Sequence, residues 1–315
     1  MSAAPIMQPA PMPASSVWAV VVTFNPDVHT LQAQARSLIR EAVPIIWVDN
    51  GSHQPLDALA AELGIQLVKL GGNHGIAAAQ NEGVELAMAQ GAGYVLLMDH
   101  DSVPGDGMVR QLFDVLQAHP DAAAAGPFYS DPRTGQASHP FVWIDGLRLH
   151  RLTPPADGAP SSVVDHLISS GCLLRTRAWH DVGPMLAPLF IDFVDVEWCL
   201  RARHKGWHLR GVWGARMSHT IGHAVVRRLG RSFRVHSPTR HYFHVRNGLF
   251  LYRQPWIAFN WRVVSIWRMI LKTGFYCVFS NNRLAYIRST LKGILDGWQF
   301  NPADSSAGVQ ETVRP

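Results

Sequence analysis

Two aspartates separated by one residue, Asp99 and Asp101, are the strongest candidates for chemistry in this sequence. They follow the apolar run Tyr94–Met98, bounded by Gly93 and Ser102, which predicts a strand buried on both faces of a parallel sheet. Side chains two apart in an extended chain point to the same side, so both carboxylates would share one edge of the sheet. We therefore expect the pair to hold a divalent metal where open α/β sheets bind ligands.

Read alone, this pair has a plainer interpretation. Two aspartates at the end of a strand are about as often a helix cap or a solvated turn as a metal site. His100 stands between them, and because neighbours in an extended chain face opposite sides, we expect it to point away from the site. The metal interpretation therefore depends on what the rest of the chain brings to the same edge.

The first hundred residues must form the elements that position this pair. Predicted strands at 17–24, 45–48, 65–70 and 94–98 alternate with helical patterns, and three of them end on polar residues. These repeats predict an α/β fold with a mainly parallel sheet and right-handed crossovers. The ligand site should then be assembled from residues 23–27, 49–52, 73–81 and 99–101.

The glycine-rich loop at 71–75 leaves a second interpretation open, a dinucleotide oxidoreductase that binds nicotinamide without a metal. The GxGxxG order is absent, the loop follows the third strand instead of the first, and Asp101 would have no role. The match to a dinucleotide-binding motif is therefore weak.

A second group of acids lies in FIDFVDVEWCLR at 190–201. We expect a helix that ends near Gly206, with Asp195 in its first turn and Glu197 paired with Arg201. A strand at 207–217 should then deliver His219. Each has a plainer interpretation, a helix cap for Asp195 and a structural histidine for His219. Before this group we expect a helix at 108–118, a strand at 122–129 and a long irregular connection at 130–162 that lines an acceptor site.

Charge divides the chain into two parts. Up to residue 200 there are 9 Lys and Arg against 20 Asp and Glu, and from 201 onward there are 19 against 3. The basic part mixes tryptophans and other aromatic residues with Lys and Arg at helical spacing, which suits a helix lying on an anionic membrane surface. A basic helical cap on the catalytic domain is an equal alternative. Its longest uncharged run, 273–282, is too short to span a bilayer.

The remaining composition narrows the class of protein. The proline-rich start lacks the features of a signal peptide, and three widely spaced cysteines give neither a disulfide framework nor a zinc site, so we expect a cytoplasmic protein. Nucleic-acid binding is the main alternative without enzymatic activity, but no known nucleic-acid motif accompanies the basic charge, so we expect no nucleic-acid partner.

The ordered motifs resemble those of inverting family 2 glycosyltransferases of the GT-A fold, and among them bacterial rhamnosyltransferases. The resemblance covers about residues 17–250 and consists of the following segments: VVTFNPD, VDNGS, GNHGIAAAQNEG, LLMDHDSVP, LISSGCLL, LFIDFVDVEWCLRA, SHTIGH and HSPTRHYFHVRNGL. It implies a flexible tail (1–16), a GT-A catalytic domain (17–225), a basic helical C-terminal region (226–300) and a second tail (301–315).

The resemblance also implies roles for individual residues. The residues it places against the base, ribose, diphosphate and sugar of the donor are Thr23, Asn25, Asp49, Asn73, Gly75, Asn81 and Asp99. Asp99, Asp101 and His219 would bind Mg²⁺ or Mn²⁺, and Asp195 would be the general base. Val194 stands where many relatives carry a second acid, so Asp192 and Glu197 stay as alternatives for the base.

The resemblance implies a function as well. The enzyme would move L-rhamnose from dTDP-L-rhamnose to a lipid-linked cell-surface glycan such as an O-antigen, at the inner face of the cytoplasmic membrane. A rhamnosyltransferase that makes a rhamnolipid is the close alternative, because LISSGCLL also resembles those enzymes.

Overall fold

The computed structural model describes residues 16–131, 140–219, 224–228, 231–235, 237–280 and 282–302, with the backbone alone between 224 and 235. The tail expected at 1–16 lies outside the described residues except for Ser16, as does the tail expected at 301–315 except for its first two residues. Part of the expected connection at 130–162 and most of SHTIGH also fall outside them.

A nine-stranded sheet in the order β3-β2-β1-β4-β10-β6-β11-β5, with β9 beside β11, forms the centre of the described chain. Its strands are β1 (Val17–Thr23), β2 (Ile45–Asp49), β3 (Gln66–Lys69), β4 (Tyr94–Asp99), β5 (Ser102–Pro104), β6 (Ala122–Ser130), β9 (Ser161–Val163), β10 (Cys172–Arg175) and β11 (His208–His219). Strands β1 to β4 pair in parallel, as do β6 and β11, whereas β5, β9 and β10 run antiparallel to their neighbours. The predicted parallel arrangement of the first four strands is confirmed.

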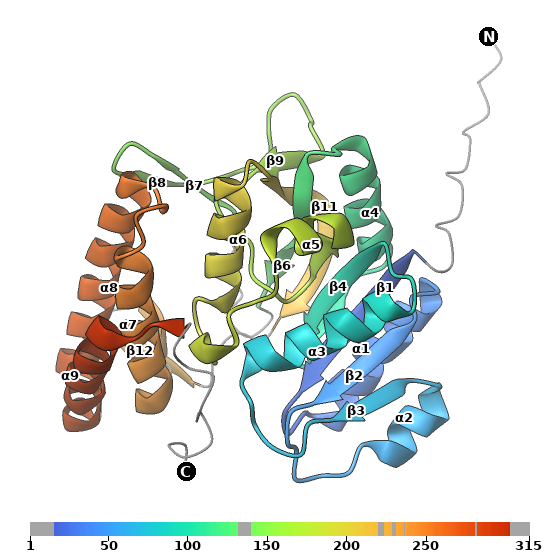
Figure 1. Ribbon diagram of the computed structural model, residues 1–315, viewed down its shortest axis with the longest axis horizontal. Helices are drawn as coiled ribbons and strands as arrows, with labels where there is room; N and C mark the ends of the chain where they lie inside the picture. The colour runs from blue at the N-terminus through green and yellow to red at the C-terminus, as the bar shows by residue number, and fades with distance from the viewer. Residues whose placement is uncertain are drawn as a thin grey trace.

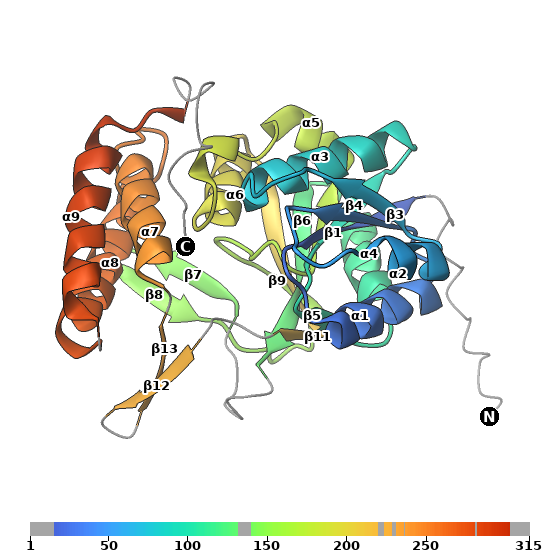
Figure 2. The ribbon, with the colours of Figure 1, turned by 90° about the horizontal axis from the view of Figure 1, so that it is seen from below.

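Helices cover both faces of this sheet, and each face has its own apolar core. The helices of this part are α1 (Val28–Arg40), α2 (Asp57–Leu63), α3 (Ile76–Ala89), α4 (Met108–Ala118), α5 (Thr176–Val182) and α6 (Val194–His204), with the short 3₁₀ helix η1 (Ala187–Leu189). Figure 2 shows α3, α5 and α6 on one side of the sheet and α1 and α4 on the other. Alternate residues of β1 enter the two cores: Val20 and Val22 belong to one core, and Ala19 and Val21 belong to the other. Because both faces of the strand are buried, its residues are apolar on both sides.

The prediction of an irregular connection at 130–162 is wrong for the described residues 140–162, which contain strands. β7 (Val142–Asp145) and β8 (Arg148–Arg151) form an antiparallel hairpin, and β9 pairs with β11 of the main sheet. Gly146 at φ 53° and Leu147 make the two-residue turn of the hairpin. A glycine at the first position of a two-residue turn is a recognised hairpin signal, but the surrounding Pro, Gly and Asp residues obscured it.

The C-terminal part is a second layer beside α6. It contains a hairpin of β12 (Ala224–Arg228) and β13 (Arg231–Val235), followed by the helices α7 (Pro238–Tyr252), α8 (Phe259–Phe279) and α9 (Arg283–Gln299), as Figure 1 shows. Gly293 and Gly297 let α9 approach α7, because a Cβ at either position would lie about 3 Å from the α7 backbone. Within the described residues, no helix has the length and apolar character needed to cross a membrane.

Candidate active site

The carboxyl ends of the parallel strands bring the first group of predicted residues together. Thr23 at the end of β1 is in register with Asp49 at the end of β2, and Val22 is in register with Asp99 at the end of β4. Parallel pairing places these ends along one edge of the sheet. The structure thus places these predicted residues along one edge of the sheet, and their contact with a ligand stays a prediction.

Asp99, Asp101 and His219 form a group that can hold a metal, since one ligand atom of each lies within 4.8 Å of the others. The antiparallel pairing of β5 with β11 puts Ser102 opposite His219, and Nδ1 of His219 consequently lies 3.3 Å from Oδ1 of Asp101. Two carboxylates and an imidazole suit Mg²⁺ or Mn²⁺.

The local conformation of the pair differs from the extended one that was expected. β4 ends at Asp99, and His100 and Asp101 lie in a turn, so the carboxylates converge through the turn and not by strand alternation. Nδ1 of His100 lies 3.3 Å from the carbonyl oxygen of Val22 on the neighbouring strand.

The pKa shifts of Asp99, Asp101 and His219 indicate that these three side chains together favour a nearby positive charge. Burial raises the pKa of Asp99. Burial is the largest single influence on Asp101 and opposes its ionisation, but the hydrogen bond with His219, together with the electrostatic attraction of His219 and His100, exceeds it and lowers the pKa of Asp101. Burial would lower the pKa of His219, yet Asp101 and Asp99 raise it. A cation placed among these groups would therefore be stabilised.

Two serines that sequence reasoning missed organise the group. The hydroxyl of Ser102 lies 2.6 Å from Nδ1 of His219 and 2.7 Å from the hydroxyl of Ser170. Ser170 in turn accepts a hydrogen bond of 3.2 Å from the backbone N–H of Asp99. Ser170 belongs to the motif LISSGCLL, but only the fold reveals its contact with β4.

The residues predicted to bind the nucleoside form one network. Oδ1 of Asp49 accepts hydrogen bonds from the hydroxyls of Thr23 (3.0 Å) and Ser52 (2.5 Å). Asn25, which has a positive φ of 48°, donates its backbone N–H to Ser52 and accepts from the backbone of His53 at 2.9 Å. This network fixes the orientation of Asp49.

The glycine-rich loop is held by two asparagines. Nδ2 of Asn50 donates to Oδ1 of Asn73 at 3.1 Å, and the same oxygen accepts from the backbone N–H of Gly75 at 3.0 Å. Oδ1 of Asn50 accepts from the backbone N–H of His74 at 2.8 Å. Asn73 and Gly75 therefore lie at the same edge of the sheet as Asp49. Asn50 holds this loop in place, a role that the sequence did not predict.

Asn81 makes a different contact from the predicted one. Its amide accepts from the backbone N–H of Met185 and donates to the carbonyl oxygen of the same residue, both at 2.9 Å. These bonds tie α3 to the segment before η1. The side chain of Asn81 thus has a structural role here, and its contact with a donor stays a prediction.

Asp195 lies in the first turn of α6, as predicted, and accepts hydrogen bonds from the backbone N–H groups of Val196 (2.8 Å) and Ser169 (3.3 Å). Burial raises its pKa to about 6, with further contributions from the negative charges of Asp192 and Asp99. A carboxyl with this pKa is ionised at neutral pH and is still basic enough to accept a proton.

The other two acids of this segment are bound to arginines. Asp192 pairs with Arg240 of α7 at 3.1 Å, which lowers the pKa of Asp192 despite burial. Glu197 pairs with Arg201 at 2.8 Å, as predicted. Among the residues that the structure describes, Asp195 is the member of the three without an ion-pair partner.

The segment before α6 has an unusual backbone. Phe190, Asp192 and Phe193 all have φ between 63° and 65°, a conformation that costs free energy in residues other than glycine. Nδ2 of Asn247 on α7 lies 2.9 Å from the carbonyl oxygens of Leu189, Ile191 and Asp192. Helix α7 thus stabilises the turn that presents Asp192 and Asp195, a role that sequence reasoning did not assign to Asn247.

Comparison with solved structures defines the class of fold. The GalNAc-T7 structure with UDP, GalNAc and Mn²⁺ has a TM-score of 0.55 and 15% identity, covering 92% of this chain and 57% of that one. The Staphylococcus aureus TarS 1-349 structure with UDP-GlcNAc has a TM-score of 0.58 and 12% identity, covering 90% of this chain and 81% of that one. The sheet, its flanking helices and these neighbours define a GT-A fold.

Sequence comparison gives the family. The model of Glycosyl transferase family 2 matches residues 18–181. The dTDP-rhamnosyl transferase RfbF of Shigella flexneri is 30% identical over 284 residues, which are 90% of this chain and 95% of that protein. The chain therefore belongs to glycosyl transferase family 2 and is a glycosyltransferase similar to rhamnosyltransferases.

Proposed function

We propose that this enzyme transfers L-rhamnose from dTDP-L-rhamnose to a lipid-linked glycan acceptor, with inversion at the anomeric carbon. The observation that carries the proposal is the position of Asp195. This carboxyl forms no ion pair among the described residues, has a pKa of about 6, and is close enough to Asp99 for the charge of Asp99 to raise that pKa. Direct displacement uses a base that takes the proton of the acceptor, and a metal ion nearby would offset the charge that develops on the leaving diphosphate.

Asp99, Asp101 and His219 would hold Mg²⁺ or Mn²⁺. When bound, such an ion supplies positive charge that neutralises the diphosphate as it leaves. The GalNAc-T7 structure, which shares the fold, contains Mn²⁺ together with UDP and supports this assignment by analogy.

Asp195 would act on the acceptor. Its carboxylate takes the proton from the acceptor hydroxyl while that oxygen attacks the anomeric carbon, opposite the bond to the diphosphate. The proton ends on Asp195 and the bonding electrons leave with the diphosphate, so no covalent enzyme intermediate is needed. Asp192 and Glu197 are less suited to this role because each already pairs with an arginine.

The remaining polar edge of the site would bind the donor. Thr23, Asn25 and Asp49 would contact the base and ribose, and Asn73 and Gly75 would border the diphosphate. The choice of dTDP-L-rhamnose is supported by the similarity to RfbF, a dTDP-rhamnosyl transferase.

The acceptor proposal is supported by the outer surface of α8 and α9. Large apolar side chains are exposed there, including Trp267 (60%), Leu295 (70%) and Trp298 (69%), next to basic residues of the same helices. Such a surface suits peripheral attachment to the inner face of the cytoplasmic membrane, where lipid-linked acceptors are located. A rhamnolipid precursor on the same membrane is the alternative acceptor.

A screen of donor hydrolysis tests the proposal. Purified enzyme is incubated with dTDP-L-rhamnose, UDP-GlcNAc, UDP-galactose and GDP-mannose, each with Mg²⁺, Mn²⁺ or EDTA, and release of the nucleoside diphosphate is measured. We expect turnover of dTDP-L-rhamnose that requires a divalent ion. Preferential turnover of another donor would contradict the donor assignment.

A further inference from the structure

A cavity lies at the opposite end of α6 from Asp195. It has a volume of about 340 Å³, within the range of small-molecule sites, and lies where the hairpin β7–β8, the end of α6 and the start of α8 meet. Arg203, on its wall, follows Asp195 by eight residues of one helix, a distance of about 12 Å along the axis. The cavity is therefore separate from the proposed catalytic group.

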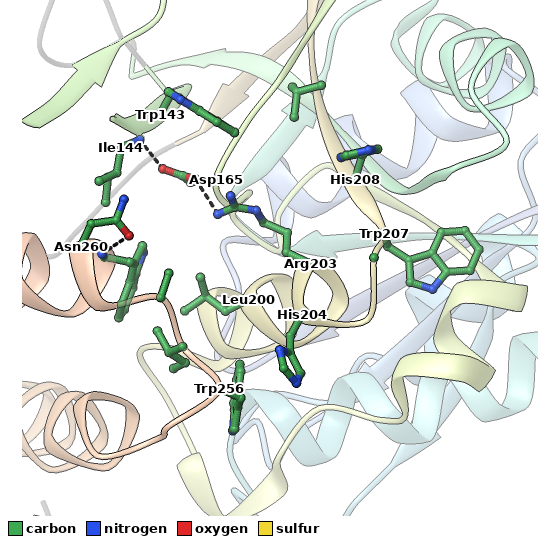
Figure 3. A pocket seen from close by; sticks show the side chains of 15 residues that line it. Trp143, Ile144, Asp165, Leu200, Arg203, His204, Trp207, His208, Trp256 and Asn260 are labelled. Carbon is green, nitrogen blue, oxygen red and sulfur yellow. Dashed lines mark hydrogen bonds and ion pairs between the residues drawn. The ribbon is translucent and has the colours of Figure 1, made fainter. Parts of the chain in front are cut away.

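Two tryptophans face this cavity from opposite sides, as Figure 3 shows. Trp143 comes from β7 and Trp256 from the loop before α8, and both are half-buried. Within the described part of the chain, no group accepts a hydrogen bond from either indole N–H. Trp207 also lines the cavity, but in Figure 3 its ring points away, and its N–H donates to Asp181 at 2.7 Å.

Polar groups lie between the two rings. Arg203 pairs with the buried carboxylate of Asp165 at 2.5 Å, and its guanidinium lies 5.2 Å from the ring centre of Trp143. Asn260 at the start of α8 also lines the cavity, and its Oδ1 accepts from the backbone N–H of Trp261 at 2.8 Å, which leaves its side-chain amide N–H groups to donate. Hydrogen-bonding groups thus stand beside flat apolar surfaces.

The charges of this cavity favour a neutral ligand. Asp165 and Arg203 compensate each other, so neither a phosphate nor a cation would find an unpaired opposite charge in this pair. Leu200 and Ile257 add buried apolar surface. Aromatic faces that contact C–H groups, together with donors and acceptors for hydroxyls, match the two kinds of surface on a sugar ring.

We infer that this cavity is a carbohydrate-binding site for a sugar unit of the acceptor chain, remote from the unit that receives the transferred sugar. The inference rests on the proposed function in taking the acceptor to be a glycan. One face of the sugar stacks on Trp256 or Trp143, and its hydroxyls bond to Asn260 and Arg203. Binding there would keep a growing glycan on the enzyme between transfers.

Saturation-transfer NMR with methyl α-L-rhamnopyranoside and an α-linked rhamnose disaccharide tests the inference. The proteins are the wild type, Trp256→Ala, Trp143→Leu and, as a control on a different helix, Ile39→Ala on the exposed face of α1. Loss of one stacking ring should weaken disaccharide binding about fivefold to tenfold, since aromatic contacts contribute about 1 kcal/mol beyond burial. The control variant should bind like the wild type.

Two outcomes would overturn the inference: no binding to the wild type, or equal binding to both cavity variants and the wild type. Thermal unfolding followed by circular dichroism establishes that each variant is folded, and Trp143→Leu, on a half-buried hairpin, provides a test even if Trp256→Ala is unstable. Hydrolysis of dTDP-L-rhamnose is measured on the same samples. Normal hydrolysis without disaccharide binding contradicts this inference alone, whereas cavity-dependent binding without hydrolysis contradicts the proposed function alone.

Discussion

Three acids lie within six residues at the start of α6, and their partners distinguish them. Asp192 and Glu197 each form an ion pair with an arginine. The hydrogen bonds that Asp195 accepts come from the backbone N–H groups of Ser169 and Val196. A base must exchange a proton with the substrate, and a carboxylate held by a guanidinium is poorly suited to that task. This difference supports Asp195 as the general base. The sequence motif alone did not distinguish it from Asp192 and Glu197.

Replacing Asp195 with Asn should lower kcat by about 10²-fold to 10⁴-fold, the usual contribution of a positioned general base. Donor binding should be unchanged because the predicted nucleotide contacts lie elsewhere. Steady-state kinetics and calorimetry with dTDP-L-rhamnose measure the two effects. Glu197→Gln serves as the comparison, and a larger loss of kcat in that variant would move the assignment to Glu197.

The pKa of Asp195 predicts a pH dependence for activity and for stability. The base works only when ionised, so kcat/KM, which reports the ionisation of the free enzyme, should rise with pH through about pH 6 and level off above it. Folding opposes the ionisation of this group, so its contribution to stability falls as pH rises from 3.8 to about 6. Asn carries no charge, so the stability of the Asn variant relative to the wild type should increase between pH 4 and pH 7 by on the order of 2–3 kcal/mol. Urea unfolding at the two pH values measures this, and a difference that does not change with pH would contradict it.

At the scale of elements, the start of α3 and the turn before α6 support each other. Gly75 has φ 85°, and a Cβ there would lie 2.7 Å from the carbonyl oxygen of Phe190. The backbone N–H of Ile76 donates to that same oxygen at 2.8 Å. The glycine-rich loop of the donor edge and the turn that presents Asp195 thus form one unit.

Gly75→Ala should disturb this unit. The added methyl group meets backbone that cannot move easily, so we expect a loss of about 2–4 kcal/mol in the free energy of unfolding together with lower kcat. Gly71→Ala is the matched control, since Gly71 also has a positive φ (75°) but nothing within 4 Å of the added Cβ. It should lose only about 1 kcal/mol. Equal losses in both variants, measured by urea unfolding, would show that conformation alone, and not the contact with Phe190, explains the effect.

Elements and strand ends could be predicted from local patterns, whereas the contacts that organise the site could not. The apolar runs and the polar residues after them located Thr23, Asp49 and Asp99, because strand periodicity and sheet direction follow from sequence. Ser170 meets Asp99, and Asn247 meets the turn at 189–192, only after the sheet order and the packing of α7 are known. The positive φ of Phe193 has no signal in sequence, since tertiary contacts impose it on a residue that disfavours it.

At the scale of the whole molecule, the basic part of the sequence contributes β11 to the central sheet and the helices α7, α8 and α9 to a second layer. Figure 1 shows α8 and α9 as the outermost helices, on the far side of α7 and α6 from the sheet. Their inner faces are buried at Trp261, Tyr276 and Tyr286, while their outer faces expose apolar side chains. These helices thus cap the catalytic part, and their exposed apolar side chains are those of the membrane surface that we propose, so the two interpretations of the sequence are compatible.

The membrane prediction concerns this outer surface. Replacing Ile270, Leu291 and Leu295 together with Gln should weaken binding to vesicles containing phosphatidylglycerol at least about tenfold, because each side chain loses favourable burial of about 1–2 kcal/mol. Donor hydrolysis should be unchanged. Cosedimentation measures binding, with Ile39→Gln on exposed α1 as control. Equal cosedimentation of the wild type and the triple variant would contradict the prediction.

The mechanism depends most on a divalent ion at Asp99, Asp101 and His219 that binds the donor diphosphate, and calorimetry on Asp101→Asn tests this dependence directly. dTDP-L-rhamnose is titrated into the wild type and the variant, each with Mn²⁺ and with EDTA. We predict tight binding only by the wild type with Mn²⁺, and similar weak binding under the other three conditions. Equal affinity of the variant and the wild type in the presence of Mn²⁺ would contradict the proposed metal site.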